Sequence, residues 1–422
     1  MKLPYGRGFL EVELPAQADV IEPSHVSGLA DECGALTDAL RKPQSGPALS
    51  ERVRHSDSIG IVVCDVTRPF PAARVLPVLI DELKGHSITV FVATGTHRPC
   101  TSAELEFMLG RHVLDRTTVV QHDCFDRARH ATLGTVPGSD VPALVEKVFL
   151  DQDVRITTGF IEPHFFAGFS GGPKMVAPGL AALETVLELH SATRIAHPKA
   201  RWGVVDGNPI HDAVREIAAR ARVTFNLDVA LNREREITGV FAGDLFDSHQ
   251  LGCDFVRQTA MARSDRLYDV VVTTNSGYPL DQNLYQTVKG MSAGAQIVKP
   301  GGAIVVVSEC SDGMPDHGGY RHLLAKSETP EGFLRMIEQQ GFVTHDQWQV
   351  QIQAMIRLRA RVFVKNEVVS DAVLRESWLD PVDDVGATVA RLMKEAGPGG
   401  RLAVLPDGPQ TVPFLAEPTP IR

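Results

Sequence analysis

The segment Thr157–His164 reads TTGFIEPH, and Gly168–Lys174 continues it as GFSGGPK. It opens in a β-branched run, Val154–Thr158, that predicts a strand end, and it then passes through a glycine-rich turn to a lysine. Glycines let backbone N–H groups converge on an anion, usually a phosphate. The turn is not a P-loop, because Pro173 stands where the second glycine belongs and Met175 where the Mg²⁺-binding hydroxyl belongs. This turn therefore predicts a phosphate-containing cofactor that is bound in a different way from ATP in a P-loop.

Three other segments also read as strands that end in functional groups. The first is Ile59–Cys64, which is followed by the sequence DVTRP. The second is Ser87–Ala93, followed by TGTHRP, and the third is Tyr268–Thr274, followed by NSGYP. Near-continuous apolar strands that alternate with helical patterns indicate parallel sheets covered on both faces. Ligands of such sheets bind beyond the carboxyl ends of the strands. We therefore predict an α/β fold with these groups at the strand ends.

The 422 residues are enough for two domains. We predict an N-terminal domain over residues 1–262 and a C-terminal domain over residues 266–405, each a mostly parallel sheet flanked by helices. The Pro-rich residues 406–422 are predicted to lie back on the first domain. The active site is expected in the cleft between the two domains.

Local patterns predict several further elements. Leu10–Leu14 predicts an opening strand of the first domain, and Val223–Leu231 with Ile237–Val240 predicts a hairpin. Arg257–Asp265 is mostly polar and predicts a connection into the second domain. A helix is expected from about Gln282 to Ile297.

Composition limits the classes of function. The chain is 43% hydrophobic and 22% charged, and its net charge of −10 argues against nucleic acid or an anionic membrane as the main partner. Six cysteines lack any C-x-x-C pair, which favours reduced thiols over a disulfide framework. No apolar run reaches the length of a membrane span, and the start has no signal-peptide pattern. The expected location is the cytoplasm.

Two histidines lie on separate strand-end segments, His97 after Gly95-Thr96 and His164 after Glu162-Pro163. Alone, each is more readily explained as a histidine that only hydrogen-bonds its own loop. Together they form a candidate acid/base pair. Two such groups on opposite sides of a substrate would suit an enzyme that acts on both stereoisomers.

His190 and Arg68 are further candidates. His190 follows the helical stretch Ala181–Leu189 and would be a lone imidazole ligand, because no H-x-x-x-H or H-x-H pair accompanies it. Its alternative role is an interaction with the helix dipole. Arg68 is a candidate bidentate clamp for a carboxylate, and its alternative is a surface ion pair.

Tyr285 and Lys289 stand four residues apart in the sequence YQTVK, on one face of the predicted helix. Such a face could close over a site from the second domain. A solvated helix surface is the alternative explanation for the lysine.

The ordered set of these motifs resembles the nickel-pincer lactate racemase family, from about residue 10 to beyond residue 350. Each motif is weak alone, and the set in order is specific. The motifs are Asp65-x-Thr67-Arg68-Pro69, Gly95-Thr96-His97-Arg98, Glu162-Pro163-His164, Ser170-Gly171-Gly172-Pro173-Lys174, His190-Ser191 and Tyr285-Gln286-Thr287-Val288-Lys289.

The resemblance implies a racemase or epimerase of 2-hydroxy acids that uses a nickel-pincer nucleotide, a pyridinium mononucleotide that holds nickel through two sulfur groups and a ring carbon. Lys174 matches the lysine joined to the cofactor, and His190 matches the imidazole that completes a square-planar nickel site. His97 and His164 match the pair that takes the substrate hydroxyl proton, one for each enantiomer, while hydride moves to the cofactor and back. The enzymes that synthesise the cofactor are the expected maturation partners.

The remaining matches concern binding. Arg68 matches a contact to the substrate carboxylate, Gln286 and Lys289 match second-domain contacts, and Trp348 loosely matches an active-site aromatic residue. The other expected cofactor contacts are Asp65, Thr67, Gly95, Gly171, Gly172 and Tyr285.

The substrate and two rival functions stay open. Lactate is the default substrate, and Arg98 could serve a second carboxylate, as in malate, or a cofactor phosphate. One rival is an NAD-dependent or sugar-phosphate enzyme, although no G-x-G-x-x-G follows the early strands. The other is a two-lobed binding protein without catalysis, which would not need three histidines and a lysine at one sheet edge.

Overall fold

A computed structural model describes residues 1–315, 318–339 and 341–415. The chain forms two compact units. Unit 1 comprises Met1–Ser24, Ser191–Ala196 and Gln258–Arg422, and unit 2 comprises His25–His190 and His197–Arg257. Both units are α/β, which confirms the predicted fold class. No helix among the described residues is both long and apolar enough to cross a membrane.

Unit 2 is built around a six-stranded sheet in the order β13-β12-β9-β4-β5-β6, parallel except for the edge strand β13. Its elements, in chain order, are α1 (Glu32–Arg41), η1 (Leu49–Glu51), β4 (Ser58–Cys64), α2 (Ala72–Glu82), β5 (Ser87–Ala93), α3 (Ser102–Leu109), α4 (Arg111–Leu114), β6 (Thr118–Gln121), η2 (Arg127–Arg129), β7 (His130–Thr135), β8 (Pro142–Glu146), α5 (Lys147–Leu150), β9 (Val154–Phe160), β10 (Pro163–His164), β11 (Gly168–Phe169), η3 (Gly172–Met175), α6 (Leu183–Leu189), α8 (Pro209–Arg220), β12 (Phe225–Leu231), β13 (Ile237–Gly243) and most of α9 (Leu245–Ala260).

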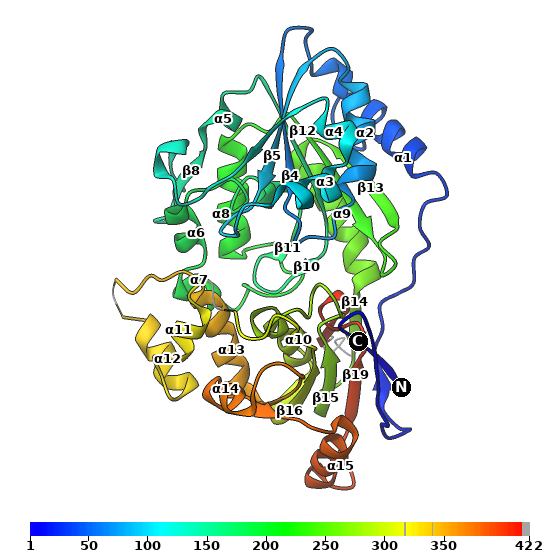
Figure 1. Ribbon diagram of the computed structural model, residues 1–422, viewed down its shortest axis with the longest axis vertical. Coiled ribbons are helices and arrows are strands. Elements are labelled where there is room, and N and C mark those ends of the chain that lie inside the picture. The colour runs from blue at the N-terminus through cyan, green and yellow to red at the C-terminus, as the bar shows by residue number, and fades with distance from the viewer. Residues whose placement is uncertain (316–317, 340, 416–422) are drawn as a thin grey trace, which may run out of the picture. The chain divides into compact units, whose positions relative to one another are not determined.

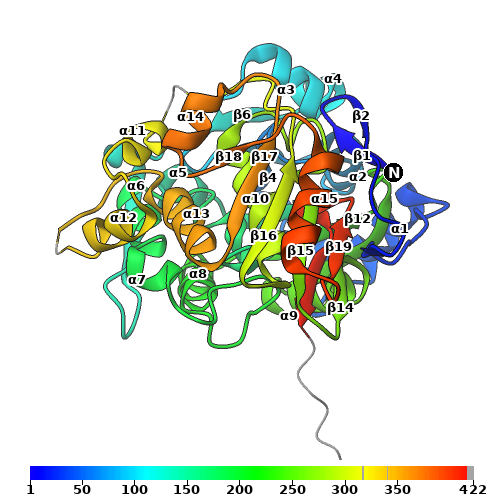
Figure 2. The same cartoon turned by 90° about the horizontal axis from the view of Figure 1, so that it is seen from below.

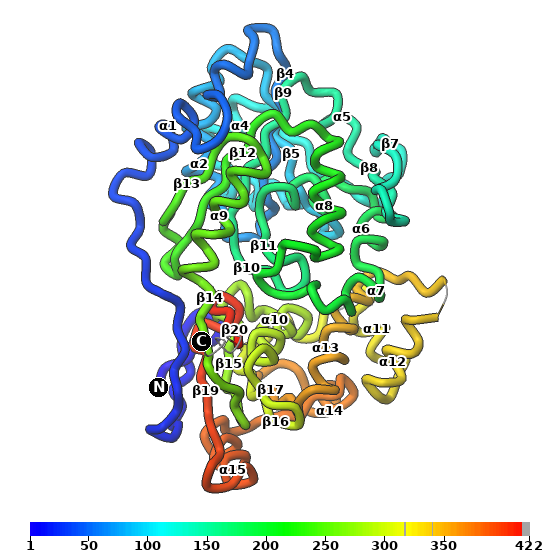
Figure 3. The backbone as a smooth tube through the Cα atoms, turned by 180° about the vertical axis from the view of Figure 1, so that it is seen from behind, coloured from blue at the N-terminus to red at the C-terminus, as the bar shows by residue number. Residues whose placement is uncertain are grey.

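Burial explains why the central strands read as continuous apolar runs. Six of the seven residues of β4 are buried, because helices cover both faces of the sheet. Helix α2 packs through Ala72, Val75, Leu76 and Leu79, which recur at the spacing of one helix face. Figure 1 shows α2 to α4 on the near side of the sheet, and Figure 3, from behind, shows α8 and α9 on the opposite side.

Unit 1 contains a second six-stranded parallel sheet, β18-β17-β16-β15-β19-β3 (Figure 2). Its elements are β1 (Lys2–Tyr5), β2 (Gly8–Glu11), β3 (Asp19–Val20), α7 (Ala192–Ile195), β14 (Met261–Ser264), β15 (Tyr268–Thr274), α10 (Leu284–Ala295), β16 (Val298–Val307), α11 (Tyr320–Leu324), α12 (Pro330–Ile337), α13 (Gln347–Arg359), β17 (Arg361–Lys365), α14 (Asp371–Glu376), β18 (Asp380–Pro381), α15 (Val385–Ala396), β19 (Leu402–Leu405), η4 (Gly408–Gln410) and β20 (Val412–Leu415).

The two faces of this sheet pack against different helices because side chains alternate along a strand. Val270 and Val272 of β15 share a core with Val389 of α15. Val271 and Thr273 face the other way, where a Cβ placed at Gly294 of α10 would lie 3.5 and 3.6 Å from their side chains.

The compact units differ from the predicted domains at both ends. The predicted strand Leu10–Leu14 is instead β2, paired antiparallel with β1, and residues 1–24 belong to unit 1. The physical reason is burial, since Leu3, Tyr5 and Val12 share the core of Val270 and Val389.

The predicted connection and tail are also more ordered than expected. Helix α9 continues to Ala260, and β14 follows directly where Arg257–Asp265 was expected to be a polar connection. Strand β14 pairs in parallel with β20 inside unit 1, and the packing of residues 406–422 on the first domain stays a prediction. Residues 416–422 lie outside the described part of the chain.

Candidate active site

The candidate site of unit 2 lies at the carboxyl ends of three adjacent strands, β9, β4 and β5. The chain runs from β4 outward to β5 and β6 and then returns to the other side of β4 as β9. Such a reversal is the position at which open α/β sheets bind ligands. Asp65 follows β4, the turn that carries His97 follows β5, and the segment of His164 follows β9.

Asp65 orients the His97 ring. Its Oδ2 lies 2.7 Å from His97 Nδ1, and its Oδ1 accepts from the backbone N–H of Thr67 at 3.0 Å and from the Thr67 hydroxyl at 2.6 Å. Burial alone would raise the pKa of the Asp65 carboxyl, but His97, Arg68 and the Thr67 hydroxyl lower it to about 2. An ionised Asp65 accepts only, so His97 Nδ1 is the N–H donor and Nε2 keeps its lone pair.

His164 has the opposite arrangement. It lies in the short hairpin of β10 and β11, where its Nδ1 accepts from the backbone N–H of Ala167 at 3.2 Å. In the neutral ring the proton is therefore on Nε2. The structure thus gives the predicted pair a direction, with His97 Nε2 an acceptor and His164 Nε2 a donor.

Arg68 and Arg98 differ in their surroundings. Among the described residues, no hydrogen bond or ion pair is found for the half-buried guanidinium of Arg68. Arg98 is exposed and forms a bidentate pair with Glu104, with N–O distances of 2.8 and 2.6 Å. Arg68 is therefore the arginine that can accept a carboxylate guest, whereas the fork of Arg98 is already occupied.

Phe166 was not predicted as a site residue, yet three predicted residues meet at its ring. Its centroid lies 4.5 Å from the ring of His164 and 5.0 Å from that of His190, and Lys174 Nζ lies 6.0 Å from the same centroid. Buried Asn208 fixes the backbone here by donating to the Phe166 carbonyl at 2.9 Å. The only sequence signal was the Phe165-Phe166 pair, which reads as core.

Lys174 lies in η3, and Pro173 separates it from two glycines in the left-handed region, with φ of +77° at Gly171 and +47° at Gly172. A Cβ at Gly172 would lie 2.5 Å from the ring of His249, so only glycine fits. The N–H of Gly172 donates to Asp228 Oδ2 at 2.9 Å. Gly172 therefore shapes the turn, and its N–H is not available to a phosphate as predicted.

Gly95 has the same role beside His97. Its φ is +56°, and its N–H donates to the carbonyl of Gly179 at 3.1 Å. The predicted contact of Gly95 with the cofactor is therefore not one through this N–H. The bond instead joins the His97 turn to the segment that follows Lys174.

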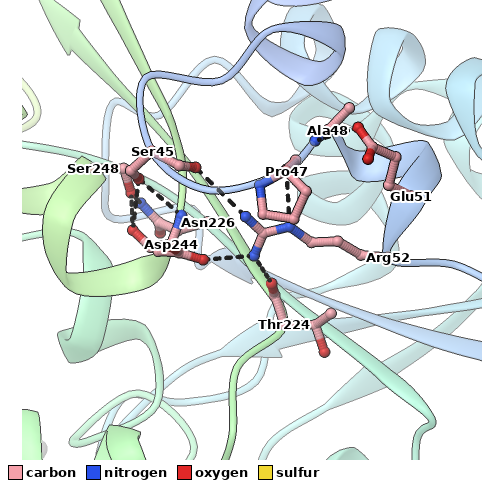
Figure 4. A network of polar contacts seen from close by, with 9 residues as sticks. All are labelled: Ser45, Pro47, Ala48, Glu51, Arg52, Thr224, Asn226, Asp244 and Ser248. Atoms are coloured by element: carbon pink, nitrogen blue, oxygen red, sulfur yellow. Dashed lines mark hydrogen bonds and ion pairs between the residues drawn. The ribbon is translucent and has the colours of Figure 1, made fainter.

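A buried polar network lies beneath the Lys174 turn. Asn226 donates to Asp228 at 3.1 Å and to Ser248 at 2.9 Å, and it accepts from Thr157 at 2.9 Å. Figure 4 shows Asn226 directed at Ser248, which in turn donates to the carbonyl of Asp244 at 2.8 Å. Burial raises the pKa of Asp228 to about 6, against its hydrogen bonds from Asn226 and Gly172. Asp228 was not predicted as a site residue, because one acid in an apolar strand carries no motif.

Two more buried histidines support the turn. His249 Nε2 lies 2.9 Å from the carbonyl of Ser170, and its ring is stacked on that of His211 at 6.1 Å. Burial lowers the pKa of His211 to about 3 and that of His249 to about 4. Both rings are therefore neutral near pH 7 and form part of the scaffold.

His190 ends α6 with its Nδ1 2.7 Å from the carbonyl of Val186. A carbonyl only accepts, so Nδ1 carries the proton and, in the neutral ring, Nε2 is the nitrogen that has the lone pair. This arrangement suits a single imidazole ligand.

The predicted residues of the second domain gather within unit 1. Tyr285, Gln286 and Lys289 lie in the first two turns of α10. The Tyr285 ring packs at 5.4 Å from that of Tyr320, and Gln286 Oε1 is buried without a hydrogen bond among the described residues. Trp348 is buried on the neighbouring α13. The cleft between the domains stays a prediction.

Two family models match the chain. The lactate racemase N-terminal domain matches residues 5–203, and the lactate racemase C-terminal domain matches residues 264–412. The lactate racemase of Thermoanaerobacterium thermosaccharolyticum is 32% identical to this chain over 419 residues, and the match covers 97% of each of the two chains. The lactate racemase of Lactiplantibacillus plantarum is 35% identical over 379 residues, which cover 88% of each chain.

Solved structures agree with these matches. The lactate racemase apoprotein from T. thermosaccharolyticum superposes with a TM-score of 0.92 at 31% identity, over 98% of this chain and 99% of that one. A Thermotoga maritima protein superposes with a TM-score of 0.70 at 19% identity, over 93% of this chain and 100% of that one, and so shares the fold.

Proposed function

The chain belongs to the lactate racemase family and is an isomerase, and we propose that it racemises a small 2-hydroxy acid, with lactate as the first candidate. The observation that carries this proposal is the opposite orientation of two imidazoles. His97 Nε2 is an acceptor because Asp65 holds Nδ1–H, and His164 Nε2 is a donor because Ala167 occupies Nδ1.

The chemistry needs one acid/base group for each enantiomer. Conversion of a 2-hydroxy acid to its keto form removes the hydroxyl proton as the carbonyl develops. His97, as a neutral imidazole, takes this proton on Nε2 from one enantiomer and becomes an imidazolium. His164, as an imidazolium, returns a proton from Nε2 when the other enantiomer forms and is left neutral. In the reverse direction His164 is the neutral base and the His97 imidazolium is the acid. Arg68 holds the substrate carboxylate by two parallel N–H···O bonds.

The nickel-pincer nucleotide is the proposed cofactor, and the residues present fit it. Lys174 Nζ would carry the covalent link, and His190 Nε2 would bind nickel, because Val186 already takes the Nδ1 proton. When bound, the cofactor supplies the site that accepts hydride from the substrate carbon and gives it back. Asp65, Thr67, Gly171 and Tyr285 are the further proposed contacts, with Gln286 and Lys289 from unit 1.

One experiment separates this function from its rivals. The chain is expressed with and without the enzymes that synthesise the cofactor, and intact mass, nickel content and racemisation of lactate are measured. We expect an adduct mass, about one nickel per chain and racemisation only in the co-expressed sample, and none of the three in Lys174→Ala. An adduct that persists in Lys174→Ala, or racemisation that depends on added NAD, would refute the assignment.

The substrate panel includes malate and larger 2-hydroxy acids, because the motifs leave the substrate tail undefined. The maturation enzymes as partners and a cytoplasmic location belong to the same proposal.

A further inference from the structure

A second cluster of potential metal ligands lies in unit 2, apart from Lys174 and His190. His122 directly follows β6, His130 begins β7, and Glu146 ends β8. One ligand atom of each side chain lies within 4.8 Å of the other two. The three residues are buried, with exposed fractions of 1%, 5% and 0%. A glutamate is almost never fully buried without a partner, and a buried polar group of any kind costs free energy unless it is hydrogen-bonded.

Neighbouring groups turn both imidazoles in the same sense. His130 Nδ1 lies 2.9 Å from the Asp126 carbonyl, so it carries the proton. The Thr94 hydroxyl donates to the His122 carbonyl at 2.9 Å, which leaves its oxygen as the acceptor for His122 Nδ1 at 3.3 Å. Both Nε2 lone pairs then face each other across 2.9 Å. Two facing lone pairs repel unless a cation lies between them.

Glu146 supplies the negative charge beside this pair. Neither of its carboxylate oxygens makes a hydrogen bond of full geometry among the described residues, although the Arg129 guanidinium and the Val148 N–H lie near the carboxylate. Arg129 Nη2 lies 3.0 Å from Oε2, but it donates to the carbonyl of Gln121 at 2.9 Å. The contact of Arg129 with Glu146 is therefore an ion pair rather than a directed hydrogen bond. Oε1 is left as a buried acceptor.

We propose that His122 Nε2, His130 Nε2 and Glu146 Oε1 bind one divalent transition-metal ion of the zinc class. Two imidazoles and a carboxylate are a zinc donor set, and a water would take the fourth position. Magnesium and calcium prefer all-oxygen sites. Tetrahedral bonds of about 2.0–2.1 Å place two nitrogens about 3.3 Å apart, so the rings must separate by about 0.4 Å.

Binding of the metal ion at this cluster would link β6, β7 and β8 to the turn that carries His97. The hydroxyl of Thr94 contacts both the ring and the carbonyl of His122, and Thr94 accepts the backbone N–H of His97 at 2.9 Å. The ion would therefore be structural and would hold the turn that carries His97. Its neighbours Asp126 and Thr94 act as the outer partners that fix ligand rings in metal sites.

The test uses the untagged full chain made without the cofactor enzymes, stripped with a chelator and titrated with Zn²⁺. We expect one equivalent to bind and Tm to rise by about 5–10 °C at a hundredfold excess over Kd. Glu146→Gln and His130→Gln should each weaken binding more than about tenfold. A Co²⁺ complex should give the visible spectrum of a tetrahedral nitrogen–oxygen site.

Two control variants remove other candidate sites. His190→Ala deletes the proposed nickel ligand, and His112→Gln deletes an exposed histidine 3.5 Å from Asp81 that could bind zinc by chance. Both should bind Zn²⁺ like the wild type. The proposal fails if the wild type binds no stoichiometric Zn²⁺, so that only a proton lies between the rings, or if folded Glu146→Gln binds as tightly. Zinc content and Tm involve no substrate, so this outcome is independent of the proposed racemisation.

Discussion

Asp65 and His97 are joined by a 2.7 Å contact between Oδ2 and Nδ1, and the second oxygen of Asp65 is fixed by the backbone N–H of Thr67. The oxygen of Asp65 that faces His97 can therefore act only as a hydrogen-bond acceptor. The single turn after β4 thus determines which nitrogen of a histidine on the next strand end carries the proton.

Asp65→Asn should reverse the His97 tautomer. The Thr67 N–H requires an oxygen at one position, so the new NH₂ group must face His97 Nδ1 and move the ring proton to Nε2. Loss of the base should lower kcat by about 10²–10⁴-fold. Nitrogen NMR of the histidine and steady-state kinetics measure the two effects. Thr67→Val keeps the backbone N–H and is the control, with a much smaller loss. Equal losses in the two variants would contradict this relationship.

His97 and His164 should serve opposite enantiomers. In His97→Gln we expect interconversion to be lost, by about 10²–10⁴-fold, while hydrogen exchange at the carbon of one enantiomer survives. His164→Gln should show the same loss with exchange of the other enantiomer. Exchange is measured by mass spectrometry with deuterated D- and L-acids. If either variant racemises both enantiomers at near-normal rates, that histidine only supports its loop.

Buried neutral histidines should make the protein less stable in mild acid. The pKa values of His211 and His249 are about 3 and about 4 in the folded chain, below the ordinary value of about 6.5. Between pH 6 and 4 the unfolded chain therefore binds more protons at these rings, and stability falls as pH falls. Asp228 acts in the opposite sense, because its pKa is raised to about 6 and the folded chain binds its proton first.

The contribution of His211 can be measured from the slope of the free energy of unfolding against pH. His211→Gln should reduce the decline of the free energy of unfolding between pH 6 and 4 by about 1.4 kcal/mol per pH unit. Urea unfolding at several pH values measures the slope, and any constant loss of stability cancels. Exposed His112→Gln should leave the slope unchanged. The interpretation fails if the slopes of wild type and His211→Gln are the same.

The sequence predicted elements best where apolar residues form an uninterrupted run. Strands β5 and β15 begin and end at the predicted residues, Ser87–Ala93 and Tyr268–Thr274, because burial on both faces makes most of their positions apolar. The Val223–Leu231 and Ile237–Val240 hairpin is also confirmed. The prediction that Leu10–Leu14 is the opening strand of the first domain was wrong, because the sequence of a short alternating strand does not show which hydrophobic core it packs against.

Site residues with a motif were found, and those that act through shape were not. His97, His164 and Lys174 stand in recognisable patterns, whereas Phe166 is an aromatic residue in an apolar loop and Asp228 a lone acid in a strand. The proton positions of the two histidines were equally hidden, since they depend on Asp65 and Ala167, 32 and 3 residues away along the chain. Only the fold determines such pairings.

Arg68→Lys should raise KM strongly. A lysine ammonium is a point charge and cannot replace the planar fork that makes two parallel bonds to a carboxylate. Loss of a charge-assisted contact of this kind costs about 2–5 kcal/mol, which corresponds to a KM increase of about 30-fold or more. Nickel content and the Lys174 adduct should be unchanged.

The matched control for this prediction is Arg98→Lys. Arg98 is exposed and already paired with Glu104, so its replacement should leave KM near the wild-type value for every 2-hydroxy acid on the panel. Steady-state kinetics in both directions, with nickel analysis of each variant, distinguish the possible roles of Arg68. An unchanged KM in Arg68→Lys would remove Arg68 from the substrate carboxylate. Loss of nickel in that variant would instead make Arg68 a cofactor contact, because the half-buried guanidinium then supports the bound nucleotide rather than the acid.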